Sequence, residues 1–222
     1  VILMASLFIK TFSYLKKMIV APFCAYCKRF DEADAVLCQP CVERINLVVS
    51  HEIEVTKTKR MRVLAVGRYE DPLRALILAK SSSQRIANVQ LGKLLWRMSN
   101  VSNIPFDYIV PIPLHWTRYA WRGYNQAQEI ARVIAHESHK PMLNLLKRTK
   151  RTPYLTYYAA DARQEKMKEV FVVRNNADMR GKHLLLVDDV MTTGATLKEA
   201  ARELWKAKPA SITAVVVARV TR

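Results

Sequence analysis

Two adjacent aspartates and the short loop behind them are the residues of this sequence best suited to chemistry. An apolar run over residues 184–187 leads directly into Asp188 and Asp189. A loop rich in hydroxyl groups follows, and the spacing of apolar residues predicts an amphipathic helix that begins near Leu197. Ionised carboxylates only accept hydrogen bonds, so this pair suits two neighbouring sugar hydroxyls or a water-bound Mg2+ ion.

The loop behind the aspartates has the composition of a phosphate cradle. A helix start presents backbone N–H donors and the positive end of the helix dipole, which together bind phosphate without a lysine. A glycine lets such a loop curl around an anion, and the threonines add hydroxyl donors. We expect a small phosphorylated ligand that carries hydroxyl groups to contact Met191, Thr192, Thr193, Gly194, Ala195 and Thr196.

Two other interpretations of this segment compete with a ligand site. An apolar strand that ends in aspartate is common in α/β proteins, where the acid can simply cap the next helix. A strand of the Walker-B kind would also end in aspartate, but it needs a G-x-x-x-x-G-K-[ST] loop, which the sequence lacks. The attached T-T-G-A-T segment therefore favours the ligand site.

All four cysteines fall in one short segment as two C-x-x-C pairs: Cys24, Cys27, Cys38 and Cys41. Four thiolates can surround one ion tetrahedrally, which is the geometry of structural zinc. Two disulfides are the alternative, and they suit oxidising compartments, but nothing in the sequence points to export. We therefore expect a structural Zn2+ site, which leaves no cysteine for nucleophilic catalysis or for a glutamine-dependent amidotransferase.

The composition describes a foldable protein with an unusual charge. The 222 residues are 50% hydrophobic, which is enough for one substantial α/β domain with a small appendage. The 36 basic and 19 acidic residues give a net charge of +17. Such a charge indicates a polyanionic partner, either nucleic acid or a substrate that carries pyrophosphate. A solvated basic surface without a partner is the alternative.

The first twenty residues predict an amphipathic helix and no membrane span. Their apolar stretch, residues 1–9, ends at Lys10, whereas a spanning helix needs about 20 apolar residues. We expect this helix to pack on its own domain; contact with a membrane surface is the alternative. Lysines at positions 10, 16 and 17 also argue against a secretory signal, so we expect a cytoplasmic protein.

Strands and helices alternate through the middle of the chain. Strands are expected over residues 61–69 and 107–112, with helices between them, one of which covers residues 86–98. Residues 115–125 are expected to form a loop, dense in arginine and aromatic residues. Asn125 is expected to cap the helix that follows.

Three ordered motifs together resemble the ComF family of competence-related proteins. They are the paired cysteines, V-P-I-P-L-H followed by R-G-Y-N-Q-A, and V-D-D-V-M-T-T-G-A-T-L, which is similar to the ribose-phosphate motif of type I phosphoribosyltransferases. The resemblance implies an α/β fold: a type I phosphoribosyltransferase-like parallel sheet flanked by helices, with a small N-terminal zinc-binding unit. We expect the amphipathic helix over residues 1–20, the zinc unit over 21–45 and the phosphoribosyltransferase-like domain over 60–222.

The resemblance also implies roles for residues. Asp188 and Asp189 would hold the ribose hydroxyls of phosphoribosyl pyrophosphate, and in an active enzyme they would be the catalytic residues. The loop from Met191 to Thr196 would hold the 5-phosphate, and Mg2+ would accompany the pyrophosphate. Arg118 and Arg122 would face the pyrophosphate, because guanidinium groups suit phosphate oxygens; solvated arginines beside a helix are the alternative.

A basic segment resembles the mobile loop of the family but departs from it at two positions. Arg148, Thr152, Arg163 and Phe171 match the family pattern, whereas Leu155 replaces a common glutamine and Lys166 stands near a common asparagine. These departures favour ligand binding over turnover. The basic residues and the tyrosines at 154, 157 and 158 also suit single-stranded nucleic acid, whose phosphates attract cations and whose bases stack on rings.

The function that the resemblance implies is that of a ComF-like protein acting in the uptake or use of single-stranded DNA during competence. Its partners would be phosphoribosyl pyrophosphate or a related phosphosugar, single-stranded DNA and proteins of the competence machinery. An active phosphoribosyltransferase that transfers ribose 5-phosphate to a base or amine is the alternative. A ligand sensor or scaffold, whose zinc unit recruits a partner, is a third interpretation.

Overall fold

A computed structural model of the chain describes residues 23–31, 36–48, 50–78, 84–150, 170–174 and 178–221. The chain divides into two compact units, Val1–Arg44 and Ile45–Arg222. The helix expected over residues 1–20 lies outside the described residues. None of the helices in the described ranges combines the length and apolarity that crossing a bilayer requires.

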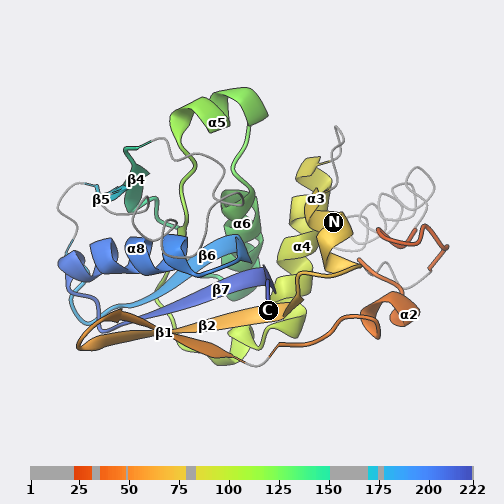
Figure 1. The fold of residues 1–222 in the computed structure, drawn as a ribbon, viewed down its shortest axis with the longest axis horizontal. Coiled ribbons are helices and arrows are strands. Elements are labelled where there is room, and N and C mark those ends of the chain that lie inside the picture. The colour runs from red at the N-terminus through yellow and green to blue at the C-terminus, as the bar shows by residue number, and fades with distance from the viewer. Residues whose placement is uncertain are drawn as a thin grey trace, which may run out of the picture. The chain divides into compact units, whose positions relative to one another are not determined.

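The larger unit is built on a five-stranded sheet of order β1-β2-β7-β6-β3 (Figure 1). Its strands are β1 (His51–Thr56), β2 (Lys59–Arg68), β3 (Tyr108–Pro111), β6 (His183–Met191) and β7 (Ser211–Arg219). Strands β2, β7, β6 and β3 pair in parallel, and only the edge strand β1 pairs antiparallel, with β2. This is the α/β sheet that the alternating sequence pattern predicts.

Helices cover both faces of this sheet, and its central strands carry continuous apolar runs. Residues 184–187 of β6 and 214–218 of β7 are all buried. Leu184 and Leu186 join the core cluster that contains the buried residues of α8 (Ala195–Leu204). Because side chains alternate along a strand, Leu185 and Val187 belong to the opposite face. Helices α4 (Gln84–Met98) and α6 (Gln126–Ser138) pack on the sheet and on each other.

The α4–α6 contact explains a glycine in the middle of a helix. A Cβ atom added at Gly92 would lie 2.8 Å from the Cβ of Val133, so the missing side chain permits the two helices to approach closely. The apolar face of α6 is formed by Ala127, Ile130, Ala131 and Ile134, all buried. The helices expected over residues 86–98 and after Asn125 are therefore confirmed.

The remaining elements are short: α2 (Gln39–Val42), α3 (Leu73–Leu78), η1 (Val101–Asn103), α5 (Trp116–Arg122), β4 (Leu146–Arg148), β5 (Phe171–Val173) and η3 (Trp205–Ala207). Strands β4 and β5 form a separate antiparallel pair. Helix α5 corrects the loop expected over residues 115–125. It has no long apolar stripe, but Nδ1 of His115 accepts a hydrogen bond from the Thr117 N–H at its start, and Gly123, at φ +75°, ends it.

Candidate functional site

The aspartate pair lies inside β6, which extends further than the apolar run predicts. Residues Asp188 and Met191 pair with Val216 and Arg219 of β7, so the ladder continues past both carboxylates. The neighbouring strand β3 ends opposite Val187. Asp188 and Asp189 therefore project beyond the β3 side of the sheet at its carboxyl end, where open α/β sheets bind ligands.

The loop that follows β6 turns tightly into α8. Gly194 has φ +78°, a left-handed conformation that favours glycine, and its carbonyl accepts a hydrogen bond of 2.8 Å from the Lys198 N–H. A Cβ atom added at Gly194 would lie 2.7 Å from Cδ1 of Ile53 on β1, so the turn is also closely packed. Helix α8 begins at Ala195, slightly earlier than expected, while Thr192 and Thr193 are exposed. The first turn of α8 thus opens beside the acidic pair.

The environment of Asp188 disfavours its charge. Burial raises the pKa of Asp188 well above its usual range, and the charge of Asp189 raises it further. The backbone N–H of Asp189, 2.9 Å from Asp188 Oδ1, and the positive charge of Arg148 act in the opposite direction. Donors from a ligand, or a bound cation, would favour the ionised form of this carboxyl. The ligand-free site therefore favours the protonated form of Asp188.

Two residues that follow β2 in the chain were not assigned from the sequence: Tyr69, on which the charge of Asp189 acts, and its neighbour Arg74 of α3. Tyr69 follows β2, and its N–H donates to the carbonyl of Arg219 at 2.8 Å. Burial raises the pKa of the Tyr69 hydroxyl; Arg74 opposes this through its charge and a hydrogen bond, whereas the charge of Asp189 reinforces it. Tyr69 and Arg74 thus lie close to the acidic pair. The sequence could have indicated Tyr69, because β2 and β6 run parallel and their carboxyl ends lie at the same edge of the sheet.

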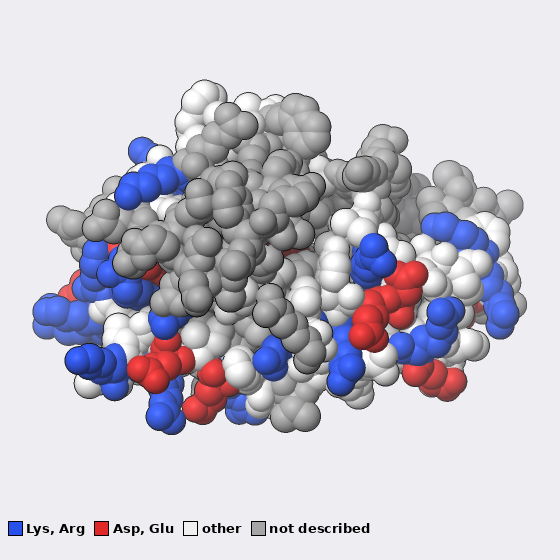
Figure 2. Space-filling view, in the orientation of Figure 1, with Lys and Arg blue, Asp and Glu red and all other residues white. Residues whose placement is uncertain are grey.

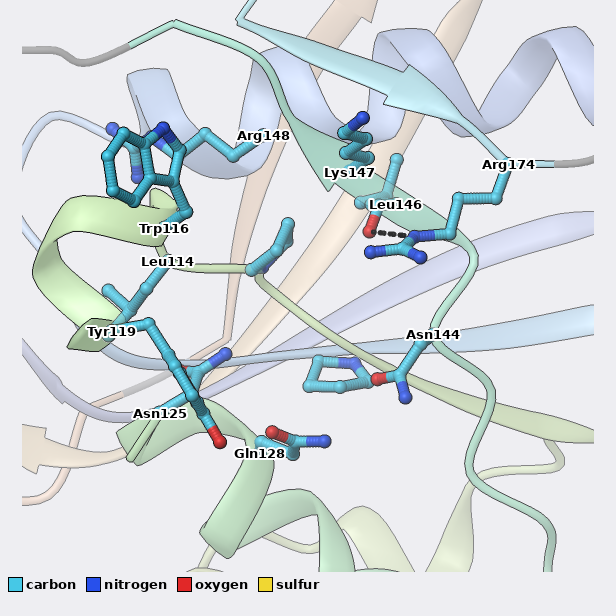
Figure 3. A pocket seen from close by; sticks show the side chains of 12 residues that line it. Leu114, Trp116, Tyr119, Asn125, Gln128, Asn144, Leu146, Lys147, Arg148 and Arg174 are labelled. Carbon is cyan, nitrogen blue, oxygen red and sulfur yellow. Dashed lines mark hydrogen bonds between the residues drawn. The ribbon is translucent and has the colours of Figure 1, made fainter. Parts of the chain in front are cut away.

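A cleft of about 340 Å³ opens between α5, the start of α6 and strand β4 (Figure 3). Its lining residues include aromatic, amide and cationic side chains and no acid: Pro111, Pro113, Leu114, Trp116, Tyr119, Asn125, Gln128, Asn144, Leu146, Lys147, Arg148 and Arg174. Arg148 joins this cleft to the acidic pair, because the same guanidinium acts on the pKa of Asp188. The cleft and the pair are therefore neighbouring parts of one site.

Two hydrogen bonds fix the walls of this cleft. Nε of Arg174 donates to the carbonyl of Leu146 at 3.4 Å, which places its guanidinium beside the opening. The side-chain amide of Asn125 donates to the carbonyl of Ile112 at 2.8 Å. Asn125 is the residue before α6, as expected, but its side chain makes no capping bond and instead ties α6 to the end of β3.

Basic residues do not gather into one stripe on the face shown in Figure 2. Lys and Arg side chains are spread over the described surface there, with Asp and Glu between them. Several of these charges are paired, as in Arg180 with Asp178 at 2.8 Å. Local groups, such as the three cations of the cleft, are therefore the clearest candidates for selective binding of an anion among the described residues.

The smaller unit brings its four cysteines together. The Sγ atoms of Cys24, Cys27, Cys38 and Cys41 all lie within 4.8 Å of one another. All four thiols are free, and the 3.6 Å between the Sγ atoms of Cys27 and Cys38 is far longer than the about 2.0 Å of a disulfide. Thiolates around a tetrahedral zinc ion would be about 3.8 Å apart, which follows from a Zn–S distance of about 2.3 Å. The cluster is thus able to hold a metal such as zinc.

Thiol ionisation within the cluster is uneven. Burial opposes ionisation of Cys24, but backbone hydrogen bonds, chiefly that of Cys38, outweigh it and lower the pKa of Cys24 to about 6. Burial raises the pKa of Cys41 to about 12, and the neighbouring thiols and the charge of Cys24 act in the same direction. A cation at the centre of the cluster would stabilise all four thiolates at once. Without a cation, neighbouring thiolates would repel one another.

Comparison with known proteins identifies the family. Residues 108–222 match the model of the phosphoribosyl transferase domain. The chain is 32% identical over 156 residues to Competence protein F of Haemophilus influenzae, covering 65% of this chain and 67% of that protein. This chain belongs to the ComF family of phosphoribosyltransferase-like proteins. It is also 29% identical over 202 residues to the DNA utilization protein YhgH of Escherichia coli, covering 85% of this chain and 86% of that protein.

A third relative of this ComF-family chain is matched over a shorter range. Competence protein ComFC of Bacillus subtilis is 34% identical over 120 residues, which cover 50% of this chain and 44% of that protein. The domain match begins at β3 and includes the cleft, the aspartates and the loop around Gly194, but not the cysteines. The expected family and fold class are confirmed.

Several expected site residues of the ComF-family chain lie outside the described side chains. Arg118 and Arg122 belong to α5, but the positions of their side chains are not described, so their contact with pyrophosphate stays a prediction. Residues 151–169, which contain Leu155, Lys166 and the three tyrosines, lie outside the described ranges. Of the expected site, the structure describes the aspartate pair and the loop from Met191 to Thr196.

Proposed function

We propose that this ComF-family protein acts in the uptake or use of single-stranded DNA during competence, and that its acidic pair binds phosphoribosyl pyrophosphate or a related phosphosugar. The observation that carries the ligand assignment is the position of Asp188, Asp189 and the loop around Gly194 at the carboxyl end of β6. The DNA role rests on relatives named for competence and DNA utilization.

The geometry gives each group a separate task in binding. The carboxylates accept hydrogen bonds from two ribose hydroxyls, and the N–H groups from Thr192 to Thr196 hold the 5-phosphate at the start of α8. Arg148 lines the cleft and its charge acts on Asp188, so it is a charged donor that can contact the pyrophosphate. Magnesium bound to the pyrophosphate would neutralise its charge, with the aspartates as suitable oxygen ligands directly or through water.

Turnover is the less favoured alternative. An active phosphoribosyltransferase would use the same aspartates as the ribose becomes cationic at C1. The relatives, however, are named for competence and DNA utilization, and a fold shared with transferases does not establish catalysis. We therefore assign Asp188 and Asp189 to ligand binding.

A calorimetric titration with phosphoribosyl pyrophosphate and Mg2+ tests the ligand assignment. We expect saturable binding to the wild-type protein and a loss of about tenfold or more for Asp188→Ala, because charged hydrogen bonds each contribute about 1.5–3 kcal/mol. Asp107→Ala, at the opposite end of the β3–β6 pair, is the matched control and should bind normally. A wild-type protein that does not bind would exclude the assignment.

The DNA role has its own test. We expect salt-sensitive binding of a single-stranded oligonucleotide, with affinity falling steeply as salt rises. Negligible binding at low salt would contradict a direct role on DNA while leaving the phosphosugar assignment intact. In a competent host, Asp189→Asn should lower transformation if the phosphosugar site serves the DNA role.

We also propose that the four cysteines hold one structural zinc ion. Closed four-cysteine sites support a fold and have no open position for catalysis. We expect about one zinc per chain by elemental analysis. Cys38→Ser should lose the metal and the folded state of the smaller unit, because metal binding and folding are coupled in such sites. A zinc-free protein with an unchanged fold would contradict this assignment.

A further inference from the structure

The cleft in Figure 3 has an unusual combination of exposed rings. Trp116 is 71% exposed and Tyr119 is 49% exposed, although both are large aromatic residues on the short helix α5. They stand three positions apart, so they share one face of the helix. Both line the cleft, along one side of its opening, with Asn144 and Arg174 along the other (Figure 3). A flat ligand could therefore lie against their rings.

The floor of the cleft offers amide groups. Asn144 and Gln128 each carry a donor and an acceptor, which is the pattern that matches the hydrogen-bonding edge of a nucleobase. Asn125 is already used, because its amide donates to the Ile112 carbonyl. Asn125 therefore holds the start of α6 in place, while Gln128 and Asn144 line the cleft.

The remaining wall is cationic. Lys147, Arg148 and Arg174 come from β4 and from the end of β5, and none of the twelve described lining residues is acidic. By contrast, a second cleft of about 400 Å³, at the amino end of the sheet, contains Asp107 and Glu137 beside Lys140 and His183. Of these two clefts, only the first has charged lining residues that are all basic, which suits a phosphate.

We infer that the cleft between α5 and β4 is a nucleotide subsite, in which Trp116 and Tyr119 stack on a base, Asn144 and Gln128 contact its edge, and Lys147, Arg148 and Arg174 hold its phosphate. The base belongs to a free nucleotide or to a single strand, and the latter source rests on the proposed DNA function. Arg148 connects this subsite to the acidic pair, so nucleotide and phosphosugar would occupy adjacent places.

Fluorescence anisotropy with two labelled strands tests the inference. One is an oligodeoxythymidine of about twelve nucleotides, and the other is an abasic strand of equal length, which keeps the phosphates and lacks the bases. We expect the wild-type protein to prefer the strand with bases. Trp116→Ala and Tyr119→Ala should each lower that preference by about fivefold to a hundredfold, because they remove a stacking surface and leave the phosphate contacts intact.

Matched variants separate the base contacts from charge. Trp116→Phe should retain most of the preference, since a ring remains. Arg174→Ala should weaken binding of both strands by a similar factor and reduce the salt slope by about one. Because Trp116 is mostly exposed, its substitution should leave thermal unfolding unchanged, which serves as the folding control.

Thymidine 5′-monophosphate, measured by calorimetry on the same variants, distinguishes the two sources. If it binds and depends on Trp116 while the strand does not bind, the subsite stands and the DNA function fails. If the strand binds with a Trp116-dependent preference, both stand. If neither ligand depends on Trp116, or the abasic strand binds as well as the strand with bases, the inference is wrong. The phosphoribosyl pyrophosphate titration is unaffected by these outcomes.

Discussion

The two ends of the β3–β6 pair each carry an aspartate, and the pKa values of the two carboxyls are shifted in opposite directions. At the amino end, Oδ2 of Asp107 accepts a hydrogen bond of 2.8 Å from the His183 N–H, and the Asp107 N–H donates to the His183 carbonyl. That backbone hydrogen bond lowers the pKa of Asp107, and the charges of Lys182 and Lys140 lower it further. At the carboxyl end, burial and Asp189 raise the pKa of Asp188.

The difference separates an acid whose charge the protein already stabilises from one whose charge the ligand-free site disfavours. Asp107 stabilises the sheet with its charge in place, because protein groups already satisfy it. Asp188 is ionised at a cost that a ligand or cation can offset, so its charge becomes favourable mainly on binding. The β3–β6 pair thus has a closed end, where backbone hydrogen bonds satisfy Asp107, and an open end, where the proposed ligand would supply the donors for Asp188.

The largest expected effect is a pH dependence of ligand binding at the open end. Since the pKa of Asp188 is raised, the free protein must lose a proton there before the carboxylate can accept hydroxyl donors. Affinity for phosphoribosyl pyrophosphate should rise with pH by up to about tenfold per pH unit until Asp188 is ionised. Calorimetry across neutral and mildly acidic pH measures this. Asp107→Ala should keep this dependence of affinity on pH. An equal dependence in Asp188→Asn would contradict the proposed difference between the two aspartates.

A pair of glycines that flank β6 gives the next largest effect. Gly181 (φ +70°) precedes the strand and Gly194 (φ +78°) follows it. Alanine at either position should cost about 1–2 kcal/mol of unfolding free energy, because both backbones are left-handed. Nothing lies within 4 Å of a Cβ atom at Gly181, whereas at Gly194 it meets the end of the flexible Ile53 side chain.

Denaturant unfolding should therefore show similar losses for the two alanine variants, with a small excess in Gly194→Ala that Ile53→Val removes. Phosphosugar affinity should fall only in Gly194→Ala, since that turn forms the proposed phosphate cradle. Equal losses of affinity in both variants would show that the two ends of β6 are not functionally distinct.

The smallest effects concern stability against pH. A lowered folded-state pKa means that Asp107 stabilises above its unfolded pKa and that this contribution is lost as pH falls through the folded value. Asp107→Ala should thus lower the unfolding midpoint at neutral pH, with a gap that closes in acid. The effect should be modest, because exposed charges interact weakly.

For Asp188, the dependence of stability on pH has the opposite sign. Its raised folded-state pKa means that its contribution is present below the unfolded pKa and is lost as pH rises through the folded value. Ligand-free Asp188→Asn should therefore be at least as stable as the wild type at neutral and alkaline pH, in thermal unfolding without ligand. A destabilised Asp188→Asn protein there would assign Asp188 a structural role.

Local patterns predicted the central strands β2, β3 and β6 and the helices α4, α6 and α8, but not where β6 ended. The apolar run of β6 placed its core correctly, and the ComF family and α/β class were confirmed. The strand continues to Met191 because β7, which begins at Ser211, supplies partners past the aspartates. Such pairing depends on distant residues, whereas the sequence rule ended the strand at its first charge.

The sequence motif predicted the acidic pair and its loop, but not the residues that surround them. Asp188, Asp189 and the Gly194 loop form one continuous segment, so spacing alone places them together. Tyr69 follows β2, Arg74 belongs to α3 and Arg174 follows β5 of the two-stranded sheet, so only the tertiary fold brings these distant segments near the motif. Helix α5 was missed because a short capped helix has too few turns to show a period.

The place of β7 in the sheet has a consequence for how the protein is made. This strand lies between β2 and β6, although both precede it in the sequence, and it pairs with each of them along most of its length. A ribosome therefore releases β1, β2, β3 and β6 before the strand that joins them exists. The nascent chain carries two exposed, apolar strand edges until Ser211–Arg219 emerges. The sheet of the larger unit should thus form only after β7 has been released.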